Sequence, residues 1–147
     1  MAQTIPRIVS VNISEKTGEK KHNIDCSVVV VEHGLADDAH AGEWHRQVSL
    51  LAQESIEKMQ RMGLDVDCGD FAENITTRGI DLPALPIGTR LTVGDVLIEV
   101  TQIGKECHTR CAIFQQVGTC VMPLEGVFAR VIRGGVVKPG DSIEVKS

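Results

Sequence analysis

Aromatic residues are scarce in this chain: its 147 residues include three Phe, one Trp and no Tyr. A core therefore has to be built mostly from Val, Ile and Leu, and β-branched residues favour strands. The chain also has 14 glycines, which suit tight turns between short strands. The composition predicts a mainly β fold.

Long hydrophobic runs are also missing. The apolar run Val28–Val31 is far too short to cross a bilayer, and the segment Met1–Arg7 has no apolar signal core. The five cysteines are an odd number and include no Cys-x-x-Cys pair, which favours reduced thiols over a disulfide framework. These absences predict a cytoplasmic protein without a membrane segment.

An excess of positive charge is absent as well. The chain has 15 basic and 20 acidic residues, a formal charge of −5. A net negative surface argues against nucleic acid or an anionic membrane as the main partner, but it leaves room for a local basic pocket that binds a small anion. No linker or low-complexity stretch divides the sequence, so we expect one domain over residues 1–147.

Hydrophobic patterning predicts the order of the elements. Alternation and β-branched runs indicate strands, and an apolar face repeating at helical spacing before Gly63 indicates a helix over Ala52–Met62. Residues Glu15–Asn23 are predicted to form an exposed loop, and Asp81–Gly88 an irregular segment. The strands are expected at Ile5–Ile13, Ser27–Glu32 (buried), Phe71–Gly79, Arg90–Ile103 (a hairpin turning at Gly94-Asp95), Val127–Ile132 and Ser142–Val145, with a short helix over Thr109–Val117.

The segment Gly104–Cys111 carries a candidate reactive thiol. Cys107 lies beside His108 and two residues from Lys105, and nearby positive charge favours the thiolate, which is the nucleophilic and metal-binding form. The alternative is that Cys107 and Cys111 are inert buried thiols. Cys107 and Cys111 have a spacing found in structural zinc sites, but a second close pair of ligands is missing from the sequence. A lone thiolate would instead suit a softer metal.

Other polar residues are candidates for binding an anion. Arginine matches phosphate oxygens with its guanidinium fork, so Arg46 and Arg130 are candidates, together with Lys105. Asn74 with Thr76 supplies neutral donors at the end of a predicted strand, and the alternative for these two is turn chemistry. The motif Asp37-Asp38-Ala-His40 allows a carboxylate to orient His40, which could equally be a loop histidine.

Taken in order, several segments resemble the MOSC domain family, named after the C-terminal domain of molybdenum cofactor sulfurase. The likeness covers nearly the whole chain, and it rests on the ordered set rather than on any one motif. The segments are Gly34–Gly42, Arg46–Leu51, Gly69–Thr77, Leu91–Val100, Cys107, Phe128–Gly135 and Pro139–Asp141.

The resemblance implies a β-barrel-like fold with a few short helices and binding of the molybdenum cofactor, a pterin with a dithiolene-held metal and a phosphate tail. It implies that Cys107 carries sulfur as a persulfide or ligates molybdenum. It also implies a cofactor-binding set of His40, Arg46, Asn74, Thr76, Lys105 and Arg130. The chain departs from the family around the cysteine, where Glu106-Cys107-His108 replaces a proline-cysteine pair.

Three functions follow as expectations. The first is a cofactor-binding domain that carries sulfur or delivers cofactor to a molybdoenzyme. The second is a molybdenum-dependent reductase of N-hydroxylated compounds, and the third is a non-catalytic accessory module. No pyridoxal phosphate site is expected, so a sulfur carrier of this kind would need a partner such as a cysteine desulfurase. A homodimer is a further expectation, because short family members lack a second domain.

Overall fold

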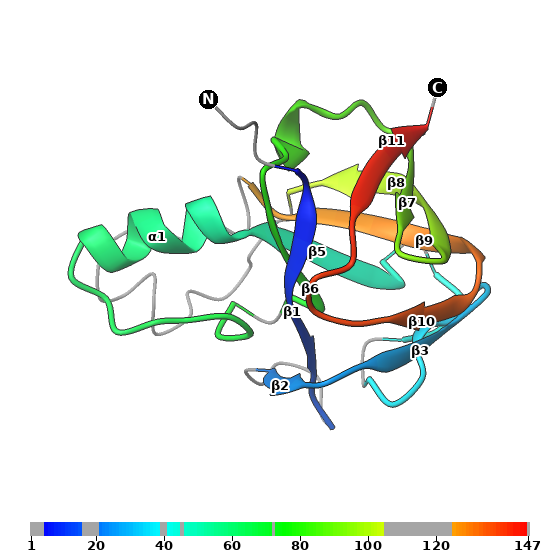
Figure 1. Ribbon diagram of the computed structural model, residues 1–147, viewed down its shortest axis with the longest axis horizontal. Coiled ribbons are helices and arrows are strands. Elements are labelled where there is room, and N and C mark those ends of the chain that lie inside the picture. The colour runs from blue at the N-terminus through cyan, green and yellow to red at the C-terminus, as the bar shows by residue number, and fades with distance from the viewer. Residues whose placement is uncertain are drawn as a thin grey trace.

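The structure is a computed structural model in which residues 5–15, 21–38, 41–44, 46–71, 73–104 and 125–146 are described. Its elements are short, as the many glycines predict (Figure 1). They are β1 (Arg7–Ile13), β2 (His22–Ile24), β3 (Ser27–Val30), β4 (Gly34–Leu35), β5 (Val48–Ala52), α1 (Gln53–Arg61), β6 (Ile75–Arg78), a 3-10 helix (Leu82–Ala84), β7 (Arg90–Val93), β8 (Val96–Ile103), β9 (Val127–Arg133), β10 (Gly135–Val137) and β11 (Ile143–Lys146).

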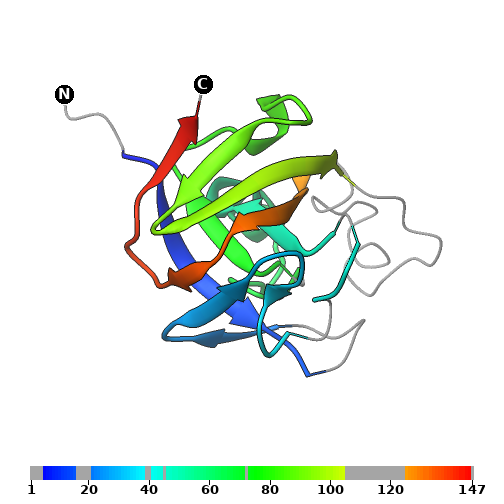
Figure 2. The same cartoon turned by 90° about the vertical axis from the view of Figure 1, so that its right-hand side faces the viewer.

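The strands form two sheets. Eight strands pair in the order β11-β7-β8-β9-β5-β6-β1-β2, and a smaller sheet has the order β10-β3-β4 (Figure 2). The mainly β prediction is confirmed. The large sheet is curved but open, because the described strands at its two ends, β11 and β2, do not pair with each other. The resemblance to a barrel is therefore one of curvature rather than of full closure.

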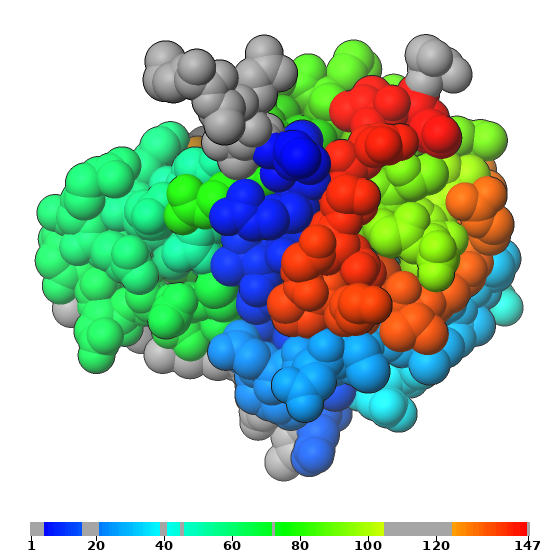
Figure 3. Space-filling model, viewed as in Figure 1, coloured from blue at the N-terminus to red at the C-terminus, as the bar shows by residue number. Residues whose placement is uncertain are grey.

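The two ends of the described chain meet beside β1. Ile8 N donates to the carbonyl of Asp141 and Gly140 N donates to the carbonyl of Ile8, both at 2.8 Å. Figures 1 and 3 show this contact as the blue and red segments lying side by side on one face. The contact brings the segment before β11 close to β1, where an isolated bridge between Arg7 and Ser142 takes the place of a strand pairing.

Two apolar clusters pack on opposite faces of the large sheet. The larger cluster fills the space between the two sheets, and it includes Val29 and Val137 of the small sheet and Leu50 of β5. The smaller cluster lies under α1, where Ile56 and Met59 pack with residues that include Leu51 and Phe128. Side chains alternate across a strand, so neighbouring residues of β5 and β9 serve the two clusters in turn. We call the face under α1 the outer face.

The predicted hairpin and helix are both confirmed. Strands β7 and β8 pair antiparallel around Gly94-Asp95, and Gly94 has φ +59° while Asp95 does not have a positive φ. This pattern fits the type II′ turn expected of a Gly-x loop. Helix α1 ends at Arg61, and Gly63 with φ +95° follows the C-cap Met62, as the sequence indicates.

Two expectations are wrong in detail. Strand β3 is only half buried, because Val28 and Val30 are 55% and 41% exposed while Val29 packs inward. The predicted exposed loop contains Lys21, which is 3% exposed. A run of β-branched residues predicts a strand, but it does not show whether one face of that strand or both are buried. The predicted helix over Thr109–Val117 lies outside the described residues.

No described helix is long and apolar enough to cross a membrane.

Gly69 allows a close backbone contact that Gly63 does not make. Both have nearly the same φ, +92° and +95°, but a Cβ on Gly69 would press against the carbonyl oxygen of Lys21, whereas a Cβ on Gly63 would have nothing within 4 Å. We expect Gly63→Ala to cost about 1 kcal/mol for the left-handed conformation. Gly69→Ala should cost about 2 kcal/mol more, because it also forces the backbone contact apart. Urea unfolding measures both, and equal losses would contradict this assignment.

Candidate functional site

Asn74 links three strands by hydrogen bonds on the outer face of the large sheet. Its backbone N–H donates to the carbonyl of Ser49 at 2.9 Å, and its side-chain Oδ1 accepts from the Ser49 backbone N–H at 2.9 Å and from Ser49 Oγ at 3.1 Å. Its Nδ2 donates to the carbonyl of Asn12 at 3.2 Å. Asn74 is 1% exposed, so this predicted cofactor residue uses its amide to join β5, β6 and β1.

Thr76 is the centre of a second set of buried bonds. Its hydroxyl donates to Glu73 Oε2 at 2.7 Å and accepts from Ser10 Oγ at 2.9 Å and Asn12 Nδ2 at 3.2 Å. The hydroxyl has one donor and two acceptor positions, and these bonds occupy them. The structure thus brings Thr76 and Asn74 together, but in the interior of the sheet rather than at a surface open to a ligand. Their role toward a cofactor stays a prediction.

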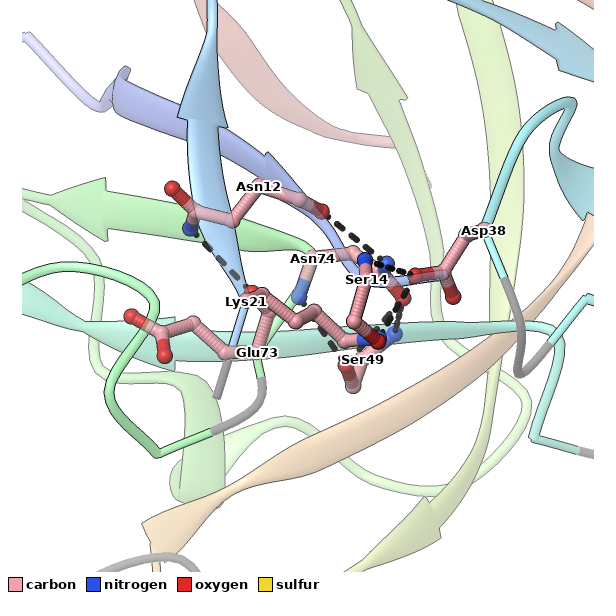
Figure 4. A network of polar contacts seen from close by, with 7 residues as sticks. All are labelled: Asn12, Ser14, Lys21, Asp38, Ser49, Glu73 and Asn74. Atoms are coloured by element: carbon pink, nitrogen blue, oxygen red, sulfur yellow. Dashed lines mark hydrogen bonds and ion pairs between the residues drawn. The ribbon is translucent and has the colours of Figure 1, made fainter. Parts of the chain in front are cut away.

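A buried ion pair anchors the segment that follows β4. Lys21 Nζ lies 2.6 Å from Asp38 Oδ1, and neither side chain is exposed. Ser14 hydrogen-bonds to both members of the pair (Figure 4). Its backbone N–H donates to Asp38 at 3.0 Å, and its hydroxyl accepts from Lys21 at 3.2 Å. Burial alone would raise the pKa of Asp38, but hydrogen bonds from Lys21, Ser14 and Asn74 outweigh it and lower the pKa. Asp38 is therefore held as a carboxylate.

Arg46 lies near two aromatic rings. Its guanidinium carbon lies 5.1 Å from the centroid of Phe128 and 5.8 Å from that of Trp44, within the range of cation–π attraction. Its Nε–H donates to Gln102 Oε1 at 3.1 Å. In the described part of the chain no carboxylate lies within ion-pair distance of Arg46. This half-buried cation can receive an anion.

Arg130 lies on the same face of β9 as Phe128, but its charge is already neutralised by carboxylates. Its Nε lies 3.3 Å from Glu99 and its Nη1 lies 3.5 Å from Glu32. The hydrogen bond from Arg90, helped by the charge of Arg130, lowers the pKa of Glu99, so that carboxyl stays charged beside both arginines. Two arginines facing two carboxylates leave little net charge for a ligand. Of the four predicted cofactor residues that are described, only Arg46 has the features of an anion receptor.

The remaining predicted site residues, His40, Lys105 and Cys107, lie outside the described residues, as do Cys111 and Cys120. Among the described residues no three His, Cys, Asp or Glu side chains gather as metal ligands would. Gly104, the last described residue of that stretch, lies at the end of β8, three positions before Cys107 in the sequence. Its N–H donates to the carbonyl of Gly126 at 2.6 Å, so β8 and β9 are joined where they border residues 105–124.

A cavity of about 280 Å³ lies at the carboxyl ends of the parallel strands β5 and β6. Three carboxylates and one lysine are among its lining groups, so its charge is unfavourable for an anion. None of the predicted site residues lines the described part of this cavity, and we favour Arg46 as the anion site. The lining residues are Ala52, Glu54, Ser55, Lys58, Gly79, Ile80, Asp81, Leu82, Pro83 and Glu125.

Sequence reasoning missed two residues of this region. Lys21 stands in a polar stretch that reads as solvent-exposed, and nothing in the sequence pairs it with Asp38. Gln102 had a usable signal, because a polar residue follows Val96, Ile98 and Val100 in the inward-facing series of β8. A polar side chain at such a position indicates that the alternation is interrupted.

The comparisons with known proteins agree with this architecture. The family model of the MOSC domain matches residues 37–144. A search of curated proteins returned no match to this chain.

Solved structures share the fold at low sequence identity. The YuaD protein from Bacillus subtilis is 18% identical with a TM-score of 0.78, covering 98% of this chain and 97% of that one. YiiM from Geobacillus stearothermophilus is 20% identical with a TM-score of 0.71, covering 97% and 75%. YiiM from Escherichia coli is 20% identical with a TM-score of 0.68, covering 98% and 71%. These likenesses show the fold.

Glu73 gives the polar network a pH dependence. Burial raises the pKa of its carboxyl, although hydrogen bonds from Gly69 and Thr76 oppose the rise, and Oε1 has no hydrogen-bond partner. Between the unfolded and folded pKa values the native state holds the extra proton, so stability falls as pH rises through that window. Glu73→Gln abolishes this titration. We expect it to be more stable than wild type by about 1 kcal/mol or more at neutral pH, with the gain disappearing below about pH 4.3.

Urea unfolding across this pH range measures the difference. Glu144→Gln, on the exposed part of β11, is the matched control for the loss of one negative charge. A gain for Glu73→Gln that does not change with pH would contradict the buried-acid assignment.

Proposed function

The chain belongs to the MOSC domain family, which is generally associated with the molybdenum cofactor, and from this premise we propose that it binds that cofactor with Arg46 as the anion-binding residue and Cys107 as the sulfur-bearing one. The observation that carries the proposal is the arrangement around Arg46: a cation without a described carboxylate partner, placed by two rings and an amide.

Charge favours this assignment. A protein with a formal charge of −5 repels an anionic ligand unless a cation is held locally. The phosphate tail of the cofactor matches a guanidinium, which donates two parallel hydrogen bonds to such a group. Arg130 and Arg90 face Glu32 and Glu99, whereas Arg46 has aromatic neighbours that leave its charge unneutralised.

Rigidity also favours Arg46. A free arginine loses about 2 kcal/mol of rotamer entropy when it is ordered around a ligand. Contacts with Trp44 and Phe128 and the bond to Gln102 order the side chain before binding, so less of that loss falls on the binding step. The residues around Arg46 thus fit an anionic group of the cofactor.

The cofactor, when bound, supplies the molybdenum and dithiolene chemistry, and the protein holds its anionic end. For the sulfur step we propose that the Cys107 thiolate attacks the outer sulfur of a donor persulfide. A new sulfur–sulfur bond forms on Cys107, and the donor cysteine leaves as a thiolate. The donor would be a partner such as a cysteine desulfurase.

Arg46→Met should reduce cofactor retention at least about tenfold, because a hydrogen bond to a charged group is worth about 1.5–3 kcal/mol. Protein from a molybdate-supplied host would be assayed for molybdenum by elemental analysis and for pterin by fluorescence after oxidation. Arg90→Met, which removes an equally charged but paired side chain, is the matched control and should retain wild-type levels. Wild-type protein free of both molybdenum and pterin would contradict cofactor binding.

Cys107→Ser should abolish the sulfur adduct, whereas Cys111→Ser should keep it. A serine hydroxyl is neither a thiolate nor able to hold a persulfide, and only the first substitution removes the proposed carrier. Mass spectrometry of the native protein, before and after treatment with a thiol reductant, detects the adduct. Equal retention by the two variants would overturn the assignment of Cys107.

A further inference from the structure

We propose that Gln102 is a positioning residue that sets the direction in which Arg46 presents its guanidinium, so that an anion is received end-on by the two terminal nitrogens of Arg46. This inference rests on the proposed function, because it concerns the same anion site. It adds a residue that the cofactor-binding set above does not contain.

A break in the pairing of β8 brings Gln102 to Arg46. Val96, Ile98 and Val100 alternate inward, so an unbroken strand would also direct Gln102 inward. The register shifts instead between Val100 and Gln102: Val100 pairs with Ala129, and Gln102 pairs with Phe128. The extra residue, Thr101, moves Gln102 to the outer face beside Phe128. Irregularities of this kind re-aim a side chain and are over-represented next to functional sites.

Two hydrogen bonds fix which way the Gln102 amide faces. Its Oε1 accepts from Arg46 Nε at 3.1 Å, and its Nε2 donates to the carbonyl of Gly104 at 2.7 Å. Rotating the amide by half a turn would set donor against donor and oxygen against oxygen. The amide therefore has one orientation that satisfies both neighbours, and it joins Arg46 to the backbone at the end of β8.

The bond to Gln102 leaves one edge of the guanidinium for a ligand. The rings of Phe128 and Trp44, at 5.1 and 5.8 Å, attract the cation, but this attraction does not fix its rotation over a ring. Gln102 accepts the hydrogen bond from Arg46 Nε–H. The side edge of the guanidinium, made by Nε and one terminal nitrogen, is therefore not available for bidentate contact with an anion. The end edge, made by the two terminal nitrogens, is the one that remains for bidentate contact with an anion.

A purely structural role for Gln102 makes a different prediction. If its bond to Gly104 only stabilised the end of β8, its loss would lower the stability of the fold and leave anion affinity unchanged. The two roles are separated by measuring affinity and stability on the same variants.

The chain contains a natural reporter of this site. Trp44 is the single tryptophan and there is no tyrosine, so intrinsic tryptophan fluorescence reports only on the ring beside Arg46. We would titrate the wild-type protein with inorganic phosphate at constant ionic strength and follow Trp44 emission. Urea unfolding of each variant would be followed by circular dichroism.

We expect Gln102→Met, which keeps the length of the side chain but lacks both hydrogen bonds, to weaken phosphate binding about tenfold. Gln102→Glu should weaken phosphate binding further, because a carboxylate beside Arg46 Nε neutralises the charge of the guanidinium. Gln60→Met is the matched control: Gln60 also donates to a backbone carbonyl, that of Val66 at 2.8 Å, but it lies on α1 and should leave the affinity unchanged.

The outcomes separate the two claims. Weaker binding in Gln102→Met, with an unfolding midpoint close to that of Gln60→Met, supports the positioning role. Wild-type affinity in Gln102→Met together with loss of binding in Arg46→Met overturns the role of Gln102 and leaves the anion site in place. Equal binding by wild type and Arg46→Met, or no binding by either, overturns the anion site and the role of Gln102 with it.

Discussion

The buried ion pair between Lys21 and Asp38 is the interaction on which the rest of the site depends. It fixes the beginning of the segment between β4 and β5, at Asp38, and Arg46 lies near the end of that segment. Removing one partner of a buried pair typically costs about 3–5 kcal/mol, a large part of a total stability of about 5–15 kcal/mol. Ser14 and Asn74 reduce the cost of burying the two charges by donating to the carboxylate or accepting from the ammonium.

From this pair the polar contacts extend along one face of the sheet. Asn74 joins the neighbouring strands through its bond to the carbonyl of Asn12. Gln47 fixes the end of the segment between β4 and β5, because its Oε1 accepts from Val131 N at 2.9 Å. Arg46, next to Gln47, then lies over Phe128 of β9. These polar residues therefore support one half-buried cation, Arg46, rather than acting as separate ligands. Buried groups such as Thr76 hydrogen-bond to one another instead.

The sequence could predict the elements but not all of their partners. Alternation located the hairpin around Gly94-Asp95, and helical spacing with Gly63 located α1, because both signals are local. Which charge Lys21 meets is decided by contacts between distant segments, so its burial was not predicted. The same reason applies to Asn74, whose polarity indicated a ligand site while its bonds to Ser49 and Asn12 join strands.

The register shift in β8 shows most directly what a single strand pattern leaves undetermined. Counting from Val100 places Gln102 in the core, and only pairing with Phe128 of β9 shows that it faces Arg46. The family resemblance predicted both Arg46 and Arg130 as cofactor residues and gave no means of ranking one above the other. The ranking came from the carboxylates around each arginine, which depend on the folded arrangement of β8 and β9.

A crystal structure of the protein soaked with tungstate would show where an anion binds, because the anomalous scattering of tungsten locates it without ambiguity. If Arg46 receives the anion, an anomalous peak lies within hydrogen-bonding distance of its terminal nitrogens, on the side away from Gln102. A peak in the acidic cavity beside α1, or at Arg130 with none at Arg46, would contradict this role of Arg46.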